Sequence, residues 1–325
     1  MSTEPSVAGL AIGVDIGGSK AAAGVVDACG RVVECVQRPT PHMDAALTED
    51  VIADLVRDLA GRYDIEAVGV GAAGWVAADR ATVLFSPHLA WRDEPLREAL
   101  RARLGMPIWI ENDANAAAWA EYRFGAARGE PVVLCVTLGT GIGGGLILSG
   151  SLFRGAFGVA GEWGHMRVVP GGRRCACGNR GCWEQYASGR ALAHDARELA
   201  ESSPFAARRL IELAGHPRAL EGIHVTTAAR EGDPAALELV AEAGAWLGQG
   251  IADLAAILDP AVVVVGGGVS EVGDLLLGPA RERYAAVLAG RGFRPELVIR
   301  AAELGAAAGL VGAADLARRS AAESS

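Results

Sequence analysis

The chain has no long apolar run, no P-loop signature and no excess of positive charge. Its longest apolar stretch, around Ala261–Val265, falls far short of the roughly 20 residues that a membrane span requires. The N-terminal residues show no basic segment followed by an apolar core, so we expect no secretory signal and a cytoplasmic protein. With 30 Lys and Arg against 39 Asp and Glu, the net charge of −9 provides no general attraction to nucleic acid or to an anionic membrane.

The sequence also lacks the evenly spread cysteines of a disulfide framework. Of its six cysteines, Cys175, Cys177 and Cys182 lie within eight residues, while the others are scattered in or near strand-like runs. In a reducing compartment this asymmetry predicts a metal site plus ordinary buried thiols.

The composition fits a two-domain α/β protein. A chain of 325 residues, 51% hydrophobic and with 44 glycines, can form two α/β domains that share a cleft. Both halves open with a strand, a glycine-rich turn and a second strand, which favours a duplicated domain. We predict a small domain at residues 1–112, joined by residues 305–325, and a large domain at 113–304. Helices are predicted at about 44–61, 93–104, 113–124 and 234–258.

Glycine patterns near both turns resemble a dinucleotide fingerprint but do not fit it. G-x-G-x-x-G begins at Gly69 and again at Gly139. The fingerprint requires a helix that begins within the motif, whereas a polar stretch follows the first pattern and a strand follows the second. The P-loop pattern G-x-x-x-x-G-K-[ST] does not occur, so both common nucleotide motifs are disfavoured.

The two turns are better explained as phosphate-binding hairpins. Residues 15–20 and 137–144 each form a strand, turn and strand whose backbone N–H groups can converge on an anion. Asp15, at the end of a buried strand, is expected to orient Mg²⁺ or its waters, although Asp is also a common turn former. Gly266–Gly268 follow an apolar strand and form either an adenosine-binding surface or a tight turn before a helix near Ser270.

A compact histidine and cysteine pattern predicts a structural zinc site. His165 is followed by the three clustered cysteines in the spacing H-x9-C-x-C-x4-C, and glycines at 178 and 181 let the loop fold back. Three thiolates and one imidazole complete a closed tetrahedral zinc shell, which would hold the loop without activating water. Reduced surface thiols, or a disulfide with one spare thiol, are the alternatives.

Three carboxylates are candidates for chemistry. Asp113 follows an apolar strand and begins an alanine-rich helix, where it is either a helix cap or the base that accepts a hydroxyl proton in phosphoryl transfer. Glu162 and Glu184 flank the cysteines and are either sugar ligands or surface charges. His165 can serve twice, with one ring nitrogen on zinc and the other on the sugar.

These motifs together resemble the ROK family, named for repressors, open reading frames and kinases, and most closely its actinobacterial-type glucokinases. The likeness spans nearly the whole chain, through GVDIGGSK, GAAGWV, WRDEPL, ENDANAAAWAEYRFG, TLGTGIGGG, GEWGHMRVVP, CACGNRGCWEQYASGRAL and VVGGGVS in that order. The resemblance implies a duplicated ribonuclease-H-like fold of the actin, hexokinase and Hsp70 type, with an interdomain cleft. It also implies ATP-dependent phosphorylation of the 6-hydroxyl of glucose with Mg²⁺ and a structural zinc, in a homodimer or homotetramer.

The resemblance assigns roles residue by residue. Asp113 is implied as catalytic base. The implied sugar ligands are Gly74, Asn112, Asp113, Glu162, His165 and Glu184, and the implied zinc ligands are His165, Cys175, Cys177 and Cys182. The implied nucleotide contacts are Gly17, Gly18, Ser19, Thr140, Gly266, Gly267 and Gly268. We add Asp15, Lys20 and Gly141 as candidates, because they belong to the same two hairpins. His88 stands where the family's glucokinases commonly have Asn, so it is left out of the sugar ligands; Ser19 replaces a more usual Thr but keeps the hydroxyl.

Several alternatives stay open. The acceptor could be fructose, mannose or N-acetylmannosamine, and polyphosphate could replace ATP if Arg173, Arg174 and Arg180 form a basic patch. A sugar-responsive repressor would need a helix-turn-helix ahead of the fold, and only about nine residues precede the first strand. An actin-like assembly protein or chaperone ATPase would have no use for the carboxylates beside the cysteines.

Overall fold

The computed structural model describes residues 9–324, which form two compact units. The first unit comprises the described part of Met1–Gly129 with Gly145–Gly161 and that of Glu303–Ser325, and the second comprises Glu130–Gly144 and Glu162–Ala302. The predicted domains differ from these units because helix α3 (Asp113–Phe124) and residues 145–161 belong to the first unit. The C-terminal residues belong with the N-terminal ones in both descriptions.

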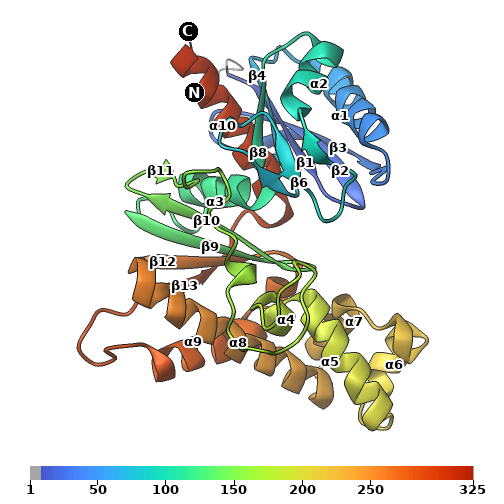
Figure 1. The fold of residues 1–325 in the computed structure, drawn as a ribbon, viewed down its shortest axis with the longest axis vertical. Coiled ribbons are helices and arrows are strands. Elements are labelled where there is room, and N and C mark those ends of the chain that lie inside the picture. The colour runs from blue at the N-terminus through green and yellow to red at the C-terminus, as the bar shows by residue number, and fades with distance from the viewer. Residues whose placement is uncertain (1–8, 325) are drawn as a thin grey trace, which may run out of the picture. The chain divides into compact units, whose positions relative to one another are not determined.

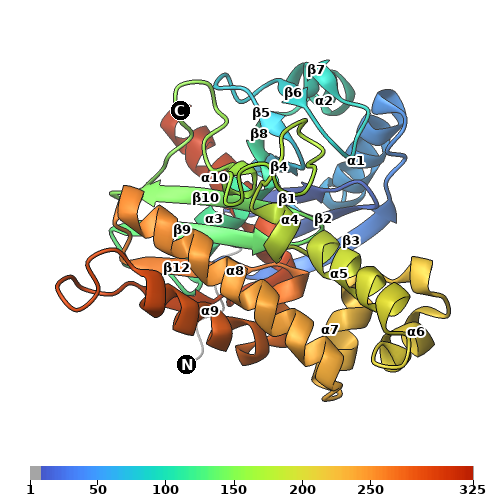
Figure 2. The same ribbon diagram turned by 60° about the horizontal axis from the view of Figure 1, so that its bottom comes forward.

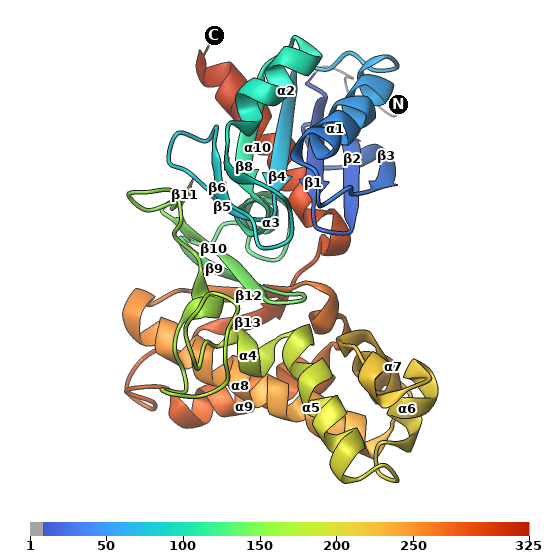
Figure 3. The same ribbon diagram turned by 45° about the vertical axis from the view of Figure 1, so that its right-hand side comes forward.

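The first unit contains a five-stranded sheet with helices on both faces. The strands are β1 (Ala11–Ile16), β2 (Lys20–Val26), β3 (Val32–Pro39), β4 (Ala67–Ala72) and β8 (Ile108–Asn112), in the order β3-β2-β1-β4-β8. Helices α1 (Ala45–Ala60) and α2 (Leu96–Leu104) cover one face, and α3 and α10 (Ala308–Ser324) cover the other (Figures 1 and 3). Because strand side chains alternate, Ile12 and Val14 meet α1 while Ala11 faces α10.

Glycines bring α10 unusually close to this sheet. A Cβ atom at Gly13 or Gly69 would lie 1.9 Å from a carbonyl oxygen of α10, at Leu310 and Ala313 respectively. Likewise, a Cβ at Gly312 would lie 1.7 Å from the carbonyl oxygen of Ala116 in α3. Side chains other than hydrogen are therefore excluded at these positions, and α10 fixes α3 against the sheet.

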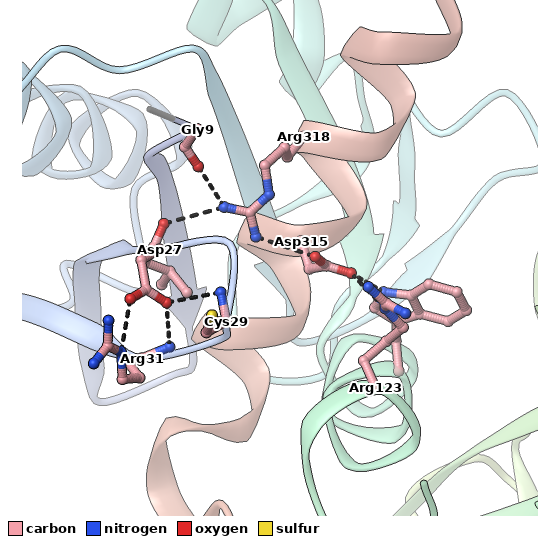
Figure 4. Close-up of polar contacts among 9 residues, drawn as sticks. Gly9, Asp27, Cys29, Arg31, Arg123, Asp315 and Arg318 are labelled. Atoms are coloured by element: carbon pink, nitrogen blue, oxygen red, sulfur yellow. Dashed lines mark hydrogen bonds and ion pairs between the residues drawn. The ribbon is translucent and has the colours of Figure 1, made fainter. Parts of the chain in front are cut away.

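A buried carboxylate adds a polar link between α10, α3 and the start of β1. Asp315 is 2% exposed and accepts from Trp119 Nε1 at 2.9 Å and Arg123 Nε at 3.3 Å (Figure 4). Arg318 Nη2 donates to Asp315 Oδ1 at 3.1 Å, and its Nη1 donates to the Gly9 carbonyl at 2.6 Å. The two arginines supply the charge that a buried carboxylate requires.

The second unit is built around strands of a similar sheet. This sheet consists of β9 (Val132–Leu138), β10 (Ile142–Leu148), β11 (Ser151–Leu152), β12 (Val262–Gly266) and β13 (Val298–Ala301), in the order β11-β10-β9-β12-β13. β10 runs from the second unit into the first, to which β11 belongs. Helix α8 (Pro234–Leu258) packs along α9 (Asp274–Val287) (Figure 2). The other helices are α4 (Glu184–Ala187), α5 (Gly189–Ser202), α6 (Arg208–Ala214) and α7 (Gly222–Arg230).

Each sheet has the same strand order. In the first, β1 pairs antiparallel with β2 and parallel with β4, which is parallel to β8. In the second sheet, β9 lies between β10 and β12 and is parallel to β12, which is parallel to β13. This repetition is what a duplicated domain requires, because the strand, turn and strand that open each half take the same place in each sheet.

Some elements differ from the sequence expectations. A small sheet of β5 (Trp75–Val76), β6 (Val83–Phe85) and β7 (Arg92–Glu94) was not predicted. The helix expected near Ser270 is a short 3₁₀ turn, η3 (Gly268–Val272), and α9 starts only after Gly273, whose φ of 63° breaks the helix. Among residues 9–324, no helix is long and apolar enough to cross a membrane.

Candidate active site

The first glycine hairpin joins β1 to β2 in the first unit. Its turn, residues 17–19, is closed by a bond from Gly17 N–H to the Lys20 carbonyl at 3.0 Å, and Ser19 and Lys20 are exposed. A Cβ at Gly18 would lie 2.8 Å from Cβ of His88, so His88 packs against the turn. His88, which stands where the family's glucokinases commonly have Asn, therefore lies beside the predicted phosphate-binding hairpin.

Asp15 is the last residue but one of β1 and lies on the face that α10 covers. Its carboxyl lies 3.1 Å from where a Cβ would stand on Gly309, in the first turn of α10. Burial raises the pKa of Asp15 from 3.8 to about 6, and the nearby Lys20 ammonium opposes this increase. A carboxylate held at such a cost and next to the hairpin is suited to a divalent cation, which favours its charged form.

Asn112 and Asp113 lie where β8 ends and α3 begins. Asn112 is the helix N-cap, because its Oδ1 accepts from Asn115 N–H at 2.9 Å. Its Nδ2 donates to the Gly74 carbonyl at 3.0 Å and to Asp113 Oδ1 at 3.0 Å. Asp113 Oδ1 also accepts from Ala114 N–H at 2.9 Å. These bonds fix the orientation of the half-buried Asp113 carboxylate and bring the predicted residues Gly74, Asn112 and Asp113 together.

The second glycine hairpin joins β9 to β10 in the second unit. Gly139 N–H donates to the Gly141 carbonyl at 3.0 Å. The start of α5 holds the turn from outside, since Gly189 N–H donates to the Gly139 carbonyl at 2.9 Å and Arg190 N–H to that of Thr140 at 3.2 Å. The exposed turn therefore presents Thr140 and Gly141 on a rigid support.

A pocket of about 500 Å³ opens beside this hairpin. It extends from Gly139 and Thr140 to Gly268, the last residue of the predicted adenosine surface. Its other lining residues are Gly189, Arg190, Ala193, Glu221, Gly222, Ile223, Thr226, Val269 and Glu271. Gly267 supports the wall rather than lining it, because its φ is 87° and a Cβ there would lie 2.5 Å from the Leu138 carbonyl oxygen.

The predicted zinc ligands come together in the second unit. One ligand atom from each of His165, Cys175, Cys177 and Cys182 lies within 4.8 Å of all the others. The Cys177 and Cys182 sulfurs are 3.6 Å apart, and the Cys175 sulfur is 3.7 Å from His165 Nδ1. In a tetrahedral site with Zn–S bonds of about 2.3 Å, neighbouring sulfurs are separated by roughly 3.8 Å. The donor set therefore fits zinc in both chemistry and spacing.

The local chain explains this convergence. Gly178 and Gly181 adopt φ values of 92° and 79°, and a Cβ at Gly181 would lie 1.7 Å from the Val169 carbonyl oxygen. Burial raises the pKa of the Cys175 thiol, and its bond to Glu184 at 3.0 Å adds to this effect. The thiolate that a metal needs is thus favoured only when a cation lies next to Cys175.

Glu184 connects the cysteine cluster to the second hairpin. Its Oε1 accepts from the Cys175 thiol, and a Cβ on Gly141 would lie 2.5 Å from its Oε2. Glu162 lies at the other side of the cluster, with Oε2 3.8 Å from His165 Nε2, while Nδ1 of the same ring faces Cys175. The structure thus brings Glu162, His165 and Glu184 to the cluster.

Two of the three arginines considered as a polyphosphate-binding patch, Arg173 and Arg180, already bond to other groups of the chain. Arg173 pairs with Asp195 and donates to the Gln185 carbonyl at 2.9 Å, and Arg180 donates to the Gly172 carbonyl at 3.3 Å. The sequence reasoning instead missed Arg190, which lines the pocket. The signal was the segment Ser188–Arg190, where a capping serine precedes an arginine in the first turn of α5.

Two α/β units of the same strand order, each with a glycine hairpin close to carboxylates, place the chain in the duplicated ribonuclease-H-like class, as predicted. A family model described as "ROK family" matches residues 11–320, so the chain belongs to the ROK family. This membership confirms the resemblance noted in the sequence.

Named relatives cover almost the entire chain. A glucokinase of Streptomyces coelicolor is 52% identical over 95% of this chain and 98% of its own. A crystal structure of a ROK family glucokinase from Streptomyces griseus in complex with glucose and AMPPNP is 52% identical, covers 96% of this chain and 100% of its own, and has a TM-score of 0.90. A ROK hexokinase from Thermus thermophilus is 36% identical, covers 97% and 99%, and has a TM-score of 0.77. These names agree with the predicted sugar kinase.

Proposed function

We propose that this chain is an ATP-dependent glucokinase that phosphorylates the 6-hydroxyl of glucose. The observation that carries this proposal is the position of Glu184, which contacts both the cysteine cluster through Cys175 and the glycine hairpin at Gly141. A carboxylate there can bind a sugar hydroxyl directly beside the phosphates that the hairpin receives. Phosphoryl transfer depends mainly on such positioning.

In the proposed mechanism, the sugar is bound by Gly74, Asn112, Glu162, His165 and Glu184. Asp113 accepts the proton of the 6-hydroxyl while that oxygen attacks the γ-phosphorus in line; the new O–P bond forms as the bond to the β-phosphate oxygen breaks, leaving ADP. The Asn112 amide and the Ala114 N–H hold Asp113 Oδ1, which supports this role because a base must be oriented before the hydroxyl arrives.

The nucleotide is proposed to occupy the pocket and the two hairpins. Gly17, Gly18, Ser19, Lys20, Thr140 and Gly141 would contact the phosphates, where backbone N–H groups offset the negative charge that develops in transfer. Gly266–Gly268 and the apolar lining by Ile223 and Val269 would receive the adenosine. Asp15 would hold Mg²⁺ or its waters, and the metal would neutralise part of the phosphate charge.

Zinc is proposed as a structural ion held by His165, Cys175, Cys177 and Cys182. When bound, it supplies a rigid anchor for the loop from which Glu162 and Glu184 are presented.

Because ATP and reduced thiols are both available in the cytoplasm, the cytoplasmic location is part of the same proposal. A homodimer or homotetramer is expected from the family resemblance, and light scattering after size-exclusion chromatography would test it.

The Asp113→Asn variant tests the proposal. Turnover of ATP with glucose should fall about 10²-fold or more, while glucose binding measured by calorimetry should be largely retained, because Asn keeps the shape but cannot accept the proton. Asp233→Asn is the matched control, since Asp233 also starts a helix and caps α8 at 2.9 Å from Ala236 N–H. Near-normal turnover in Asp113→Asn would rule out the base role.

Other hexoses remain rivals as acceptors. ADP release measured with glucose, mannose, fructose and N-acetylmannosamine would rank them, and glucose should give the highest kcat/KM. A higher kcat/KM with another sugar would show that this sugar is the preferred acceptor in the same mechanism.

A further inference from the structure

Glu111, the residue before Asn112 and Asp113, is a buried carboxylate with a full set of partners. It is 5% exposed. Its Oε1 accepts from Asn112 N–H at 3.1 Å and from Asn115 Nδ2 at 3.1 Å. The Glu111 carboxylate is therefore bonded to the residue before Asp113 and to a side chain in the first turn of α3 after it.

The charge of Glu111 is balanced by a residue 43 positions further along the chain. Arg154 Nε and Nη2 both lie 2.6 Å from Glu111 Oε2, and the arginine side chain is 23% exposed. Arg154 lies just after β11, in the segment Gly145–Gly161 that belongs to the first unit. No other cation pairs with Glu111 in the described part of the chain.

The main chain of Arg154 organises the segment that leads to Glu162. Its carbonyl accepts from Ala160 N–H at 3.0 Å, which closes a loop of residues 154–160. Gly155 turns this loop with a φ of 74°, and Gly158 has a φ of 90° and fits against Val76 and Ala77, where a Cβ would lie 2.4 Å from the Val76 carbonyl oxygen. The loop ends at Gly161, directly before Glu162.

We propose that Arg154 and Glu111 are positioning residues that hold the proposed base segment, Asn112–Asp113, and the loop that leads to the proposed sugar ligand Glu162 in one fixed arrangement. This role rests on the proposed function, because it requires Asp113 to be the base. Neither positioning residue touches the reacting atoms. Arg154 acts through Glu111 on the first turn of α3, and through its carbonyl on the loop of residues 154–160.

The physical case rests on what buried ion pairs do. A buried pair contributes little net stability compared with well-packed apolar side chains, because both charges must be desolvated. The pair does impose direction, since a guanidinium and a carboxylate meet in few geometries. In phosphoryl transfer, a displacement of about 1 Å at the base can cost roughly 10²-fold in rate. The Arg154–Glu111 pair is therefore expected to fix the position of the base segment more than it adds to stability.

The test compares Arg154→Met with Arg103→Met in the full-length chain. Arg103 is a matched control, because its side chain is 25% exposed and pairs at 2.9 Å with Glu49, whose side chain is 5% exposed, against 23% and 7% for Arg154 and Glu111. Arg154→Met should lower kcat about 10-fold or more and raise the KM for glucose, with the KM for ATP unchanged. Arg103→Met should lower thermal stability but keep all three kinetic constants.

Conservative and double variants complete the test. Arg154→Lys should recover part of kcat, because lysine keeps the charge but not the fork. Glu111→Gln should mimic Arg154→Met, and the double variant should lose little more than either single variant, since both remove the same constraint. If Arg154→Met fails to fold, Arg154→Lys and Glu111→Gln still give the same readouts.

The outcomes separate this inference from the proposed function. If Glu111→Gln and the folded Arg154 variants keep normal kcat and glucose KM while stability falls as in Arg103→Met, the pair is only structural and the inference is overturned. If Asp113→Asn also retains turnover, the base role of Asp113 fails, whereas the proposed function itself fails only if the unmodified chain releases no ADP with glucose or another hexose. Loss of kcat in both the pair variants and Asp113→Asn supports the inference.

Discussion

At the scale of single residues, Asp15 makes the protein's stability depend on pH. The pKa of Asp15 is raised from 3.8 to about 6, mainly by burial. Since the folded chain binds this proton more tightly than the unfolded chain, Asp15 contributes stability at low pH, and this contribution is lost as pH rises from about 4 through 6. The total loss is at most about 3 kcal/mol.

We therefore expect the ligand-free Asp15→Asn variant to gain stability over the natural chain as pH rises. Urea unfolding should give similar free energies at pH near 4 and a growing advantage for the variant up to pH near 7, because Asn never ionises. Comparing the two chains at each pH cancels other titrating groups, such as Glu49. A difference that stays constant across this range would show that folding does not raise the pKa of Asp15.

The cysteine cluster gives a second residue-scale prediction. Cys182→Ser should bind less than one zinc per chain by elemental analysis and raise the KM for glucose by roughly 10-fold or more, because Glu184 and His165 are held through the cluster. Cys29→Ser is the control, since Cys29 is exposed and outside the cluster.

The variant chains should be compared after exhaustive chelation as well. Full glucose affinity in a folded, metal-free sample of either variant would contradict a structural role for zinc at the sugar site.

At the scale of elements, glycines in β1 and β4 determine how closely α10 can pack. Gly69→Ala should destabilise the chain by about 1–3 kcal/mol or more, because the new Cβ would lie 1.9 Å from the Ala313 carbonyl oxygen and α10 must shift. Gly278→Ala in α9 is the matched control, with no atom within 4 Å of its new Cβ. It should be neutral or gain up to about 1 kcal/mol from helix propensity.

Thermal and urea unfolding of the two glycine variants measure this difference. Equal stabilities would mean that α10 can move away from β4 without cost, and the tight packing of α10 would then have no energetic role.

The elements predicted best from sequence were those with local signals. Helix α8 occupies residues 234–258 as predicted, because proline and Asp233 start it and Asp259, with a φ of 45°, ends it. Both hairpins were also found, since glycine-rich turns between apolar runs are unambiguous. The small sheet β5-β6-β7 was missed because strands of two or three residues carry no usable periodicity.

The candidate site could be predicted where its chemistry is compact in sequence. The cysteines and His165 lie within 18 residues, so their spacing already indicated a metal. Glu111 and Arg154 could not be paired, because a contact across 43 positions depends on tertiary packing that no local pattern encodes. The same holds for Glu184 against Gly141, and the assigned roles of all these residues stay predictions.

At the scale of the whole molecule, the charge distribution bears on the choice of phosphate donor. The chain carries a net charge of −9, and two of the residues that line the pocket, Glu221 and Glu271, are acidic against the one cation Arg190. A long polyanion gains little from such a surface, whereas adenosine can bury its ring against Ile223 and Val269. Arg173, which could have attracted a polyphosphate, is already paired with Asp195.

ATP should therefore support glucose 6-phosphate formation at least ~100-fold faster than polyphosphate at equal phosphate concentration, a difference of about 2.7 kcal/mol. Ile223→Asp provides the internal check, because Ile223 is 58% exposed and lines the pocket, so a charge there should raise the KM for ATP without changing the KM for glucose or the fold. Comparable rates with the two donors, or an ATP KM that does not change on this substitution, would show that the nucleotide base does not bind in the pocket. Selection of the donor would then depend on the hairpins alone. Their backbone N–H groups cannot select ATP, because they recognise phosphate in either molecule.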